Sequence, residues 1–295
     1  MKIVVVSVLL LLSSLVVNVQ QSPAPANPAA PQTQPVLTLQ QFLDQFLLIV
    51  APIEIWSGPT RLGTATGFFF VNEGRLYFVT NRHVVRLEQN QLFPDRLAVR
   101  LHTNRQDHTQ NANYSIQLYQ NKTSTWREEP GVDLVAIELP REDMSRYEIV
   151  SMGTDWFPPD NLVIAPGDEV MVIGYPLGFY DTLHNYPILR TGAVASAYPV
   201  PFQGQPLFLV DARLAPGTSG SPVITKPSSI QRTSTATMFG STSVYFLGVN
   251  SAEVNTSGVS TELNTIWYGK EVKTITDPSF KTATFPEPEA KKISP

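Results

Sequence analysis

The stretch APGTSGSPV, residues 215–223, surrounds Ser219 with small residues. Gly217 lies two positions before this serine and Gly220 follows it directly. One interpretation is a surface turn, because Gly, Ser, Thr and Pro are the residues that punctuate loops. The other is a nucleophile elbow, in which glycines let the backbone approach a substrate carbonyl and direct N–H groups at its developing negative charge. The second interpretation requires a base and an acid elsewhere in the chain.

Four histidines are the candidates for a base. His83 stands in LYFVTNRHVV, directly after an apolar run that predicts a strand, so rigid backbone would hold its side chain. His102 and His108, with Asp107, lie in a polar segment without the usual spacing of metal ligands, and we expect no metal site there. His184, in YDTLHNYP, is expected to be a surface or loop residue. His83 is therefore the candidate base.

Asp133 is the candidate acid. It opens DLVAIELP, a run apolar enough to be a core strand, so its carboxylate would lie at the boundary between solvent and interior. A carboxylate in that position should have a dedicated partner. The alternative is a simple turn residue at the start of a strand. The order His83, Asp133, Ser219, each in an apolar or glycine-rich setting, favours a functional role.

The elements that must position these residues are predicted to be strands. Short β-branched and aromatic runs, among them TGFFFV, LYFVT, DLVAIEL, EVMVIGY and VYFLGVNS, alternate with Gly, Pro, Asn and Asp clusters. This pattern is typical of an all-β barrel or sandwich. Helical periodicity is limited to TLQQFLDQFLLIV (38–50), which predicts an N-terminal helix, and LNTIWYGKEVKTI (263–275), which predicts a C-terminal one. Residues 278–295 are expected to be a disordered tail.

Six motifs carry a family resemblance: TATGFFF, VTNRHVV, DLVAIELP, GDEVMVIGYPLG, VDARLAPGTSGSPV and FLGVNSAEV. In this order, from about residue 64 to 254, they resemble the trypsin- and chymotrypsin-like serine proteases, most closely the bacterial branch with the HtrA/Deg proteases. The resemblance implies an all-β fold of two perpendicular six-stranded β-barrels, the first at about 50–145 and the second at about 160–265. His83 and Asp133 would come from the first and Ser219 from the second, meeting in the cleft between them.

The chemistry that this resemblance implies is peptide hydrolysis through an acyl-enzyme intermediate. A serine hydroxyl is a weak nucleophile unless an imidazole takes its proton, and a carboxylate then fixes the imidazole tautomer. His83 would be the base, Asp133 the orienting acid and Ser219 the nucleophile. The backbone N–H groups of Gly217 and Ser219 would form the oxyanion hole. The expected substrates are proteins or peptides, and neither a cofactor nor a metal is expected.

Two positions depart from the family pattern. Thr218 stands where digestive trypsins have an aspartate that pairs with a newly cut N-terminus, so we expect no zymogen switch of that kind. Ser221 replaces a residue that is more often glycine, a change that should leave the turn intact. The chain also ends soon after residue 275, and we expect none of the C-terminal PDZ domains that many HtrA-like proteases carry.

The resemblance places Arg213, Leu214, Ser251, Ala252 and Glu253 at the substrate. Arg213 lies six residues before Ser219, at the expected base of the pocket for the side chain preceding the cut. An uncompensated arginine there would favour an acidic side chain. Alternatively Arg213 turns to solvent or is neutralised by Glu253, and an apolar pocket suits Leu214; we favour this second interpretation. Ser251 is expected to hold Asp133, and its strand to bind substrate backbone by β-augmentation.

Composition sets the class of protein. The 295 residues, 42% hydrophobic and 16% charged, are enough for a substantial core. A net charge of −4 and no long Lys/Arg block argue against a nucleic-acid partner. The complete absence of cysteine is typical of a large bacterial exported domain rather than a small disulfide-stabilised one. Nothing in the sequence predicts an oligomeric state.

The N-terminus is expected to direct export. One lysine precedes an apolar run from Ile3 to about Val19, which is the layout of a secretory signal. We therefore predict a signal peptide at 1–21, a Pro/Ala/Gln-rich linker at 22–35, a protease domain at 36–277 and a secreted or periplasmic location. An uncleaved membrane anchor is the alternative, because about 17 apolar residues are at the lower limit for spanning a bilayer.

Two other functions remain open. A protease-like fold can lose its activity and serve as a binding or scaffold protein, although all three triad residues are present here. An esterase can use the same triad, but esterases usually present the serine in a G-x-S-x-G elbow and in a different triad order. An active serine endopeptidase is the function that we favour.

Overall fold

The structure, a computed structural model, describes residues 46–86 and 93–288. The predicted signal peptide (1–21) and linker (22–35) lie outside the described residues. Of the helix expected at 38–50, residues 46–50 are described: residues 46–49 are helical, whereas Val50 begins the first strand, β1. No helix in the described segments is long and apolar enough to cross a bilayer.

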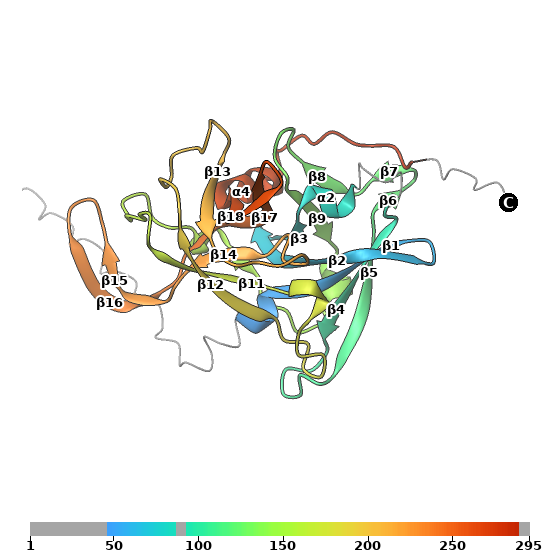
Figure 1. Ribbon diagram of the computed structural model, residues 1–295. Coiled ribbons are helices and arrows are strands. Elements are labelled where there is room, and N and C mark those ends of the chain that lie inside the picture. The colour runs from blue at the N-terminus through green and yellow to red at the C-terminus, as the bar shows by residue number, and fades with distance from the viewer. Residues whose placement is uncertain (1–45, 87–92, 289–295) are drawn as a thin grey trace, which may run out of the picture. The chain divides into compact units, whose positions relative to one another are not determined.

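The first half of the domain is an eight-stranded sheet, two strands more than the six that the resemblance implied, and with the second half it forms the mostly β fold that was expected. Its order is β5-β4-β1-β2-β3-β9-β8, with β10 paired in parallel to β2 (Figure 1). The sequence did not predict β10. Met152 of β10 pairs with Phe70 of β2, and both side chains are buried in the core. The strands are β1 (Val50–Ser57), β2 (Thr60–Asn72), β3 (Arg75–Thr80), β4 (Arg96–His102), β5 (Asn111–Gln117), β8 (Trp126–Glu128), β9 (Val135–Leu139) and β10 (Met152–Gly153).

The second half is the closed six-stranded barrel that was expected, in the order β11-β12-β13-β18-β17-β14. A separate hairpin, β15–β16, projects from it (Figure 1). The barrel strands are β11 (Glu169–Gly174), β12 (Ile188–Val194), β13 (Leu207–Asp211), β14 (Pro222–Thr225), β17 (Phe246–Thr256) and β18 (Val259–Tyr268). The hairpin strands are β15 (Ser228–Arg232) and β16 (Thr237–Ser243).

Short elements complete the described segments. A small pair of strands, β6 and β7, lies at the edge of the first half. They and the helices have these bounds: β6 (Tyr119–Gln120), β7 (Thr123–Ser124), α2 (Arg82–Val85), α3 (Arg141–Met144), η1 (Thr154–Trp156), η2 (Pro176–Gly178) and α4 (Gly269–Thr276).

Three apolar clusters hold the domain together, because side chains alternate between the two faces of each strand. On β2, Phe69 packs inside the first half, whereas its neighbours Phe68 and Phe70 pack in the cluster that joins the two halves. On β13, Phe208 packs inside the second barrel and Leu207 faces the joining cluster. The strands are therefore buried on both faces, which fixes the two halves against each other.

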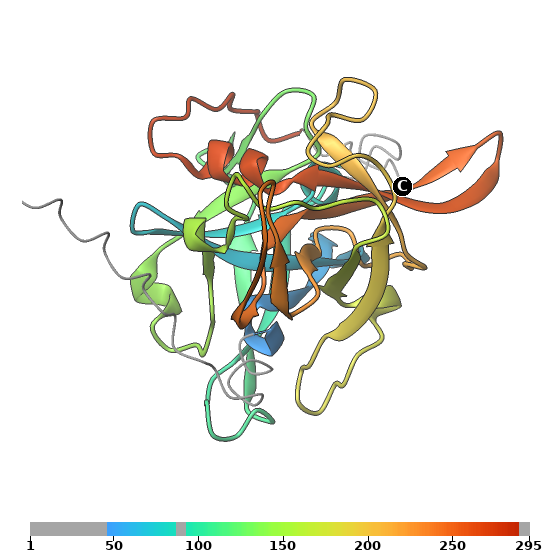
Figure 2. The ribbon, with the colours of Figure 1, turned by 90° about the vertical axis from the view of Figure 1, so that its left-hand side faces the viewer.

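The C-terminal helix is shorter than predicted. Residues 263–268, expected to be helical, belong to β18 and pair with both β13 and β17. These pairings close the second barrel, and the run TIWY is rich in residues that favour strands. Only Gly269–Thr276 form α4. Figure 2 shows β17 and β18 as a long hairpin extending beyond the barrel.

The disordered tail predicted from residue 278 is wrong for the residues that are described, 278–288. Phe285 stacks on Trp126 with ring centroids 6.2 Å apart, and the Arg86 guanidinium lies 4.4 Å from the Phe285 ring. The Phe285 N–H donates to Ser124 Oγ at 2.9 Å, and the Ser124 N–H donates to Phe285 O at 2.8 Å. The composition of this segment is polar, but Phe285 and further contacts from Phe280, Thr282 and Glu287 dock it on the first half.

Candidate active site

His83 lies on α2, a single helical turn that follows β3 directly. Val84 and Val85 on the same turn are buried in the first core, so the backbone that carries His83 is fixed. Asn81, also buried, donates from Nδ2 to the Asp133 backbone oxygen at 2.8 Å. This bond ties the segment before α2 to the segment that carries the acid.

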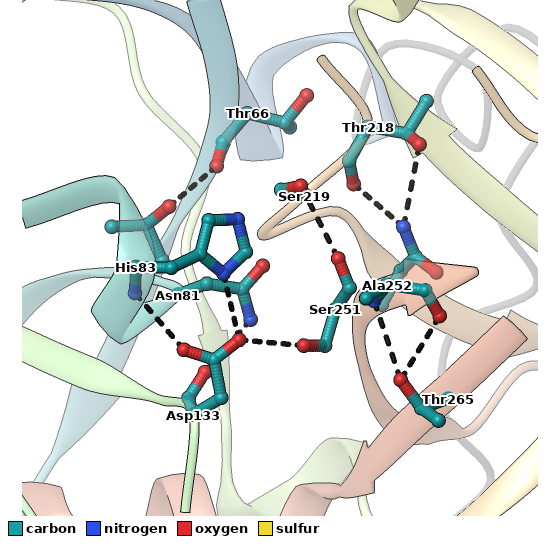
Figure 3. A network of polar contacts seen from close by, with 11 residues as sticks. Thr66, Asn81, His83, Asp133, Thr218, Ser219, Ser251, Ala252 and Thr265 are labelled. Atoms are coloured by element: carbon teal, nitrogen blue, oxygen red, sulfur yellow. Dashed lines mark hydrogen bonds and ion pairs between the residues drawn. The ribbon is translucent and has the colours of Figure 1, made fainter. Parts of the chain in front are cut away.

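Asp133 lies two residues before β9 and receives three hydrogen bonds (Figure 3). The His83 backbone N–H donates to Oδ1 at 2.9 Å, and His83 Nδ1 is 2.8 Å from Oδ2. Ser251 Oγ also donates to Oδ2, at 2.6 Å. The carboxylate thus fixes both the position of the imidazole and its tautomer, with Nδ1 as the protonated nitrogen.

The ionised form of Asp133 is favoured. Burial alone raises the pKa of this carboxyl, but the hydrogen bond and positive charge of His83, the hydrogen bond from Ser251 and the His83 backbone N–H outweigh burial. The net result is a pKa below the ordinary aspartate value. A charged carboxylate at this position stabilises the imidazolium that forms when His83 takes a proton.

Ser219 lies in the loop between β13 and β14, where two glycines adopt positive φ angles, +94° at Gly217 and +84° at Gly220. A Cβ atom on Gly217 would lie 2.7 Å from Tyr175 O, and one on Gly220 would lie 2.1 Å from Thr66 O. Neither position has space for a side chain, because backbone from other elements packs against it. This packing explains the glycines around Ser219.

Thr66, in the middle of β2, holds the loop that carries Ser219. Its backbone N–H donates to Ser219 O at 2.9 Å, and its Oγ1 donates to Gly217 O at 2.9 Å. The Tyr175 N–H in turn donates to Thr66 Oγ1 at 3.0 Å. Because the carbonyl groups of Gly217 and Ser219 are engaged in this way, their orientation is fixed by the first half of the domain.

The N–H groups of Gly217 and Ser219 donate to no other residue within 46–86 and 93–288. Asn250 braces the loop from the other side, with Nδ2 donating to Thr218 O at 3.0 Å. Two backbone N–H groups held on a braced loop beside a serine are the donors that an oxyanion hole requires.

The Ser219 hydroxyl donates to Ser251 O at 3.2 Å rather than to His83 (Figure 3). In Figure 3 the imidazole is turned with Nδ1 toward Asp133 and its other edge toward Ser219. Catalytic hydrogen bonds are often long or unaligned in the absence of substrate and form only in the complex. Binding of a substrate N–H to Ser251 O would release the hydroxyl toward His83.

The five residues expected to bind substrate are arranged around this loop. Arg213 is exposed and makes no ion pair with Glu253, which instead hydrogen-bonds Ser260 through its carboxylate. Leu214 is half-buried and packs against the core of the second barrel. These positions are consistent with Arg213 turning to solvent, and the proposed neutralisation by Glu253 is not present.

Ser251 and Ala252 lie in an irregular part of β17, where pairing with β18 is interrupted between Asn250 and Glu253. Thr265 of β18 bridges the interruption. Its Oγ1 donates to Ala252 O at 3.0 Å and accepts from the Ala252 N–H at 3.3 Å (Figure 3). This side chain replaces missing strand pairing and holds the backbone beside Ser219.

The other three histidines gather away from the triad. His102 is buried, with Nε2 2.7 Å from His184 O, and its ring centroid is 5.0 Å from that of His108. His184 stacks on Tyr186, whose hydroxyl is hydrogen-bonded to His108. His184 is thus in a loop, as expected. In the described part of the chain no three His, Cys, Asp or Glu side chains are grouped to hold a metal ion.

Sequence reasoning missed the residues that brace the site: Thr66, Asn81, Asn250 and Thr265. All four are within or beside motifs that were noted; Asn250 directly precedes Ser251, and Asn81 lies two positions before His83. Their roles depend on backbone partners that are more than 10 positions away in the chain. A buried amide or hydroxyl beside a catalytic residue is the available signal, since buried polar groups need partners.

Comparison with known protein families identifies the family of the chain. The family model described as "Trypsin-like peptidase domain" matches residues 65–228, which is more than half of the 295 residues. This match spans all three residues of the candidate triad. No curated protein sequence matches the chain.

Solved structures with a similar fold include two proteases. One is an HtrA-type protease, AlgW, with a tripeptide. It is 16% identical in sequence, the TM-score is 0.46, and the match covers 78% of this chain and 60% of that chain. The other is a serine endoprotease from Yersinia pestis. It is 13% identical, the TM-score is 0.48, and the match covers 80% of this chain and 64% of that chain. The chain spans less than two thirds of the length of either. On the family match, the chain belongs to the trypsin-like peptidase domain family.

Proposed function

We propose that the chain is a serine endopeptidase that hydrolyses peptide bonds in proteins or peptides. The observation that carries the proposal is the hydrogen-bonded pair of Asp133 and His83, at 2.8 Å, facing Ser219 across the junction of the two halves. Beside it stand the N–H groups of Gly217 and Ser219, held by Thr66. Membership of the peptidase family supports the same function.

The reaction follows from the position of each group. With Nδ1–H donating to Asp133, the other ring nitrogen of His83 is the base that removes the Ser219 hydroxyl proton. The Ser219 oxygen attacks the peptide carbonyl, and the N–H groups of Gly217 and Ser219 donate to the resulting oxyanion. The proton on His83 passes to the leaving amine, and water, deprotonated by His83, then releases the acyl group from Ser219.

Substrate would lie along β17. Extended peptide can hydrogen-bond to the backbone of Ser251 and Glu253 as an added strand. We further propose that the pocket for the side chain before the cut takes an apolar group, which Leu214 favours and the outward-facing Arg213 does not oppose. Enrichment of Asp or Glu at that position in a peptide-library cleavage profile would overturn this preference.

Export is part of the proposal and rests on the N-terminal sequence alone. We propose a cleaved signal peptide and a secreted or periplasmic enzyme. Mass spectrometry of the mature protein should find a new N-terminus between about residues 18 and 30. Intact Met1 in the membrane fraction would instead indicate an uncleaved anchor.

The test of activity compares two serine variants. Ser219→Ala removes the proposed nucleophile and should abolish hydrolysis of casein. Ser221→Ala is the matched control, because its buried hydroxyl has no hydrogen-bond partner among the described residues. This control should hydrolyse casein at close to the rate of the unmodified protein.

The same casein assay tests the alternative that the chain is a catalytically inactive binding or scaffold protein. The hydrogen bond from the Ser219 hydroxyl to Ser251 O favours this alternative, because it directs the hydroxyl away from His83. An unmodified protein that folds, as judged by circular dichroism, but does not hydrolyse casein would support the scaffold. Casein hydrolysis that persists in Ser219→Ala would show that a different residue is the nucleophile.

A further inference from the structure

A pocket of about 330 Å³ lies beside the active-site loop, between the sheet of the first half and the loop that follows β11. Strands β1, β2, β4 and β5 supply its floor, and the loop supplies its wall. The lining residues that bear on its ligand are Glu54, Arg61, Thr64, Arg100, Asn113 and Gly178.

Arg100 gives this pocket an uncompensated positive charge. Arg61 is paired with Glu54 at 3.3 Å, so these two charges cancel. The Arg100 side chain makes no ion pair or hydrogen bond with any residue of 46–86 or 93–288, and its neighbour across β5 is the neutral Asn113. Arg100 is also half-buried. A guanidinium that is partly removed from water favours a carboxylate, which can accept two parallel hydrogen bonds from it.

The pocket lies on the β2 side of Ser219, opposite β17. On one side, Ser251 O accepts from the Ser219 hydroxyl, and the β17 backbone there is the proposed site for substrate residues before the cut. On the other side, Thr66 of β2 binds the Ser219 loop. Thr64, two residues from Thr66 on the same strand, borders the pocket. A peptide that crosses Ser219 must leave toward Thr64, and therefore toward this pocket.

The loop that forms the pocket wall also contacts the oxyanion-hole loop. The Leu177 N–H donates to Pro216 O at 2.6 Å. The next residue, Gly178, lies so close to β2 that a Cβ added to it would be 3.5 Å from Thr64 Cγ2. The wall of the pocket is therefore in contact both with the loop that carries Ser219 and with β2.

We propose that this pocket binds a carboxylate in the part of the substrate that follows the cut, with Arg100 as the residue that selects it. The proposal rests on the proposed peptidase function. Strand β4 lies two strand spacings, about 10 Å, from β2, and Thr64 lies about 7 Å along β2 from Thr66. An extended peptide covers about 3.3 Å per residue. Once the reach of the Arg100 side chain is allowed for, these distances place the carboxylate about two to four residues after the cut.

Either of two groups can supply that carboxylate: an Asp or Glu side chain, or the C-terminus of a substrate cut near its end. The experiment uses one fluorescent peptide series in which only the third residue after the cut and the terminus change. The first peptide has Asp at that residue and a C-terminal amide, the second has Asn and an amide, and the third ends at Asn with a free carboxylate.

Binding is measured in a Ser219→Ala background, so the result does not depend on catalysis. We expect the Asp peptide, the free-acid peptide or both to bind at least about tenfold more tightly than the neutral peptide, as for a hydrogen bond to a charged group. The difference should vanish in Arg100→Gln and be partly retained in Arg100→Lys. Arg146→Gln, which removes an exposed arginine on the far turn after α3, is the matched control and should leave the difference unchanged.

Equal binding of all three peptides, or a preference that survives Arg100→Gln, would overturn the proposal. Cleavage of the same peptides by the protein with Ser219 intact then locates the cut by mass spectrometry. A carboxylate preference with the cut after the acidic residue would also overturn it, because the pocket would then lie on the wrong side. Carboxylate-dependent binding without cleavage would contradict the proposed peptidase function and leave the anion pocket established.

Discussion

At the scale of single residues, Asp133 has more partners than any other member of the proposed triad. It accepts hydrogen bonds from the His83 ring, the His83 backbone and Ser251. The first two orient the imidazole, and the third connects the acid to the strand proposed to bind substrate. One carboxylate therefore aligns groups from both halves of the domain.

Asp133→Asn should lower kcat by about 10³–10⁴, because an amide cannot fix the same His83 tautomer or stabilise the imidazolium. The variant should remain folded, since Asn can still accept from the His83 backbone N–H. Steady-state kinetics on a peptide substrate, together with near-UV circular dichroism, measure the two effects. A loss of less than about tenfold with an intact fold would show that Asp133 does not orient the base.

At the scale of elements, the chain brings distant segments together at β2 and at the C-terminal segment. β2 contacts the loop that carries Ser219 through Thr66, and residues 278–288 dock on the first half through Phe285. Phe285 lies against both Trp126 and Arg86, close to α2 and therefore to the backbone that carries His83. The C-terminal segment thus contributes to the folded domain.

Phe285→Ala should lower the free energy of unfolding by about 1–3 kcal/mol, less than for a fully buried phenylalanine because this ring is half-buried. Phe239→Ala is the control: its ring is 78% exposed on the β15–β16 hairpin, and its loss should change stability by less than about 0.5 kcal/mol. Urea unfolding measures both. Equal stabilities for the two variants would mean that the C-terminal segment does not stabilise the domain.

At the scale of the whole molecule, the histidine group links the two halves. His102 lies on β4 of the first half, and its partner His184 lies in the loop that follows β11 of the second. Burial lowers the pKa of His102, and the hydrogen bond to His184 O opposes this effect only in part. The nearby His108, Arg100 and His184 also disfavour a charged His102, so the folded state holds this ring neutral.

The consequence is a loss of stability in acid. The pKa of His102 is lower in the folded than in the unfolded state, so its stabilising contribution is complete above about pH 6.5 and declines as pH falls toward the folded pKa. Between pH 7.5 and 5 the melting temperature should therefore fall more for the unmodified protein than for His102→Gln, which keeps a neutral donor. An equal fall in both proteins would show that His102 is not responsible. The low pKa of Asp133 is common to both and cancels in the comparison.

Much of the architecture was predictable from strand-length apolar runs and from the motif order. The closed second barrel and the family are confirmed. Residues 263–268 were predicted wrongly because their apolar spacing suits a helix, whereas pairing with β13 and β17 makes them a strand. The tail was predicted wrongly because composition does not reveal that Phe285 meets Trp126. In both cases contacts between distant segments overrode local preference.

The candidate site was predictable only where residue type carries the chemistry. His83, Asp133 and Ser219 stand out by type and setting, and the structure brings His83 and Asp133 into contact beside Ser219. Thr66 and Arg100 carry no such signal, since each is an ordinary residue on an ordinary strand. Their roles arise from what the second half of the domain places against them.

We propose that Ser219 is a nucleophile activated by His83. This proposal is tested most directly by reaction with a serine-directed fluorophosphonate, followed by mass spectrometry of the digested protein. We expect one adduct, on Ser219, that forms rapidly in the unmodified protein and is lost or greatly slowed in His83→Ala. An adduct on a different residue, or labelling of Ser219 at the same rate without His83, would contradict it.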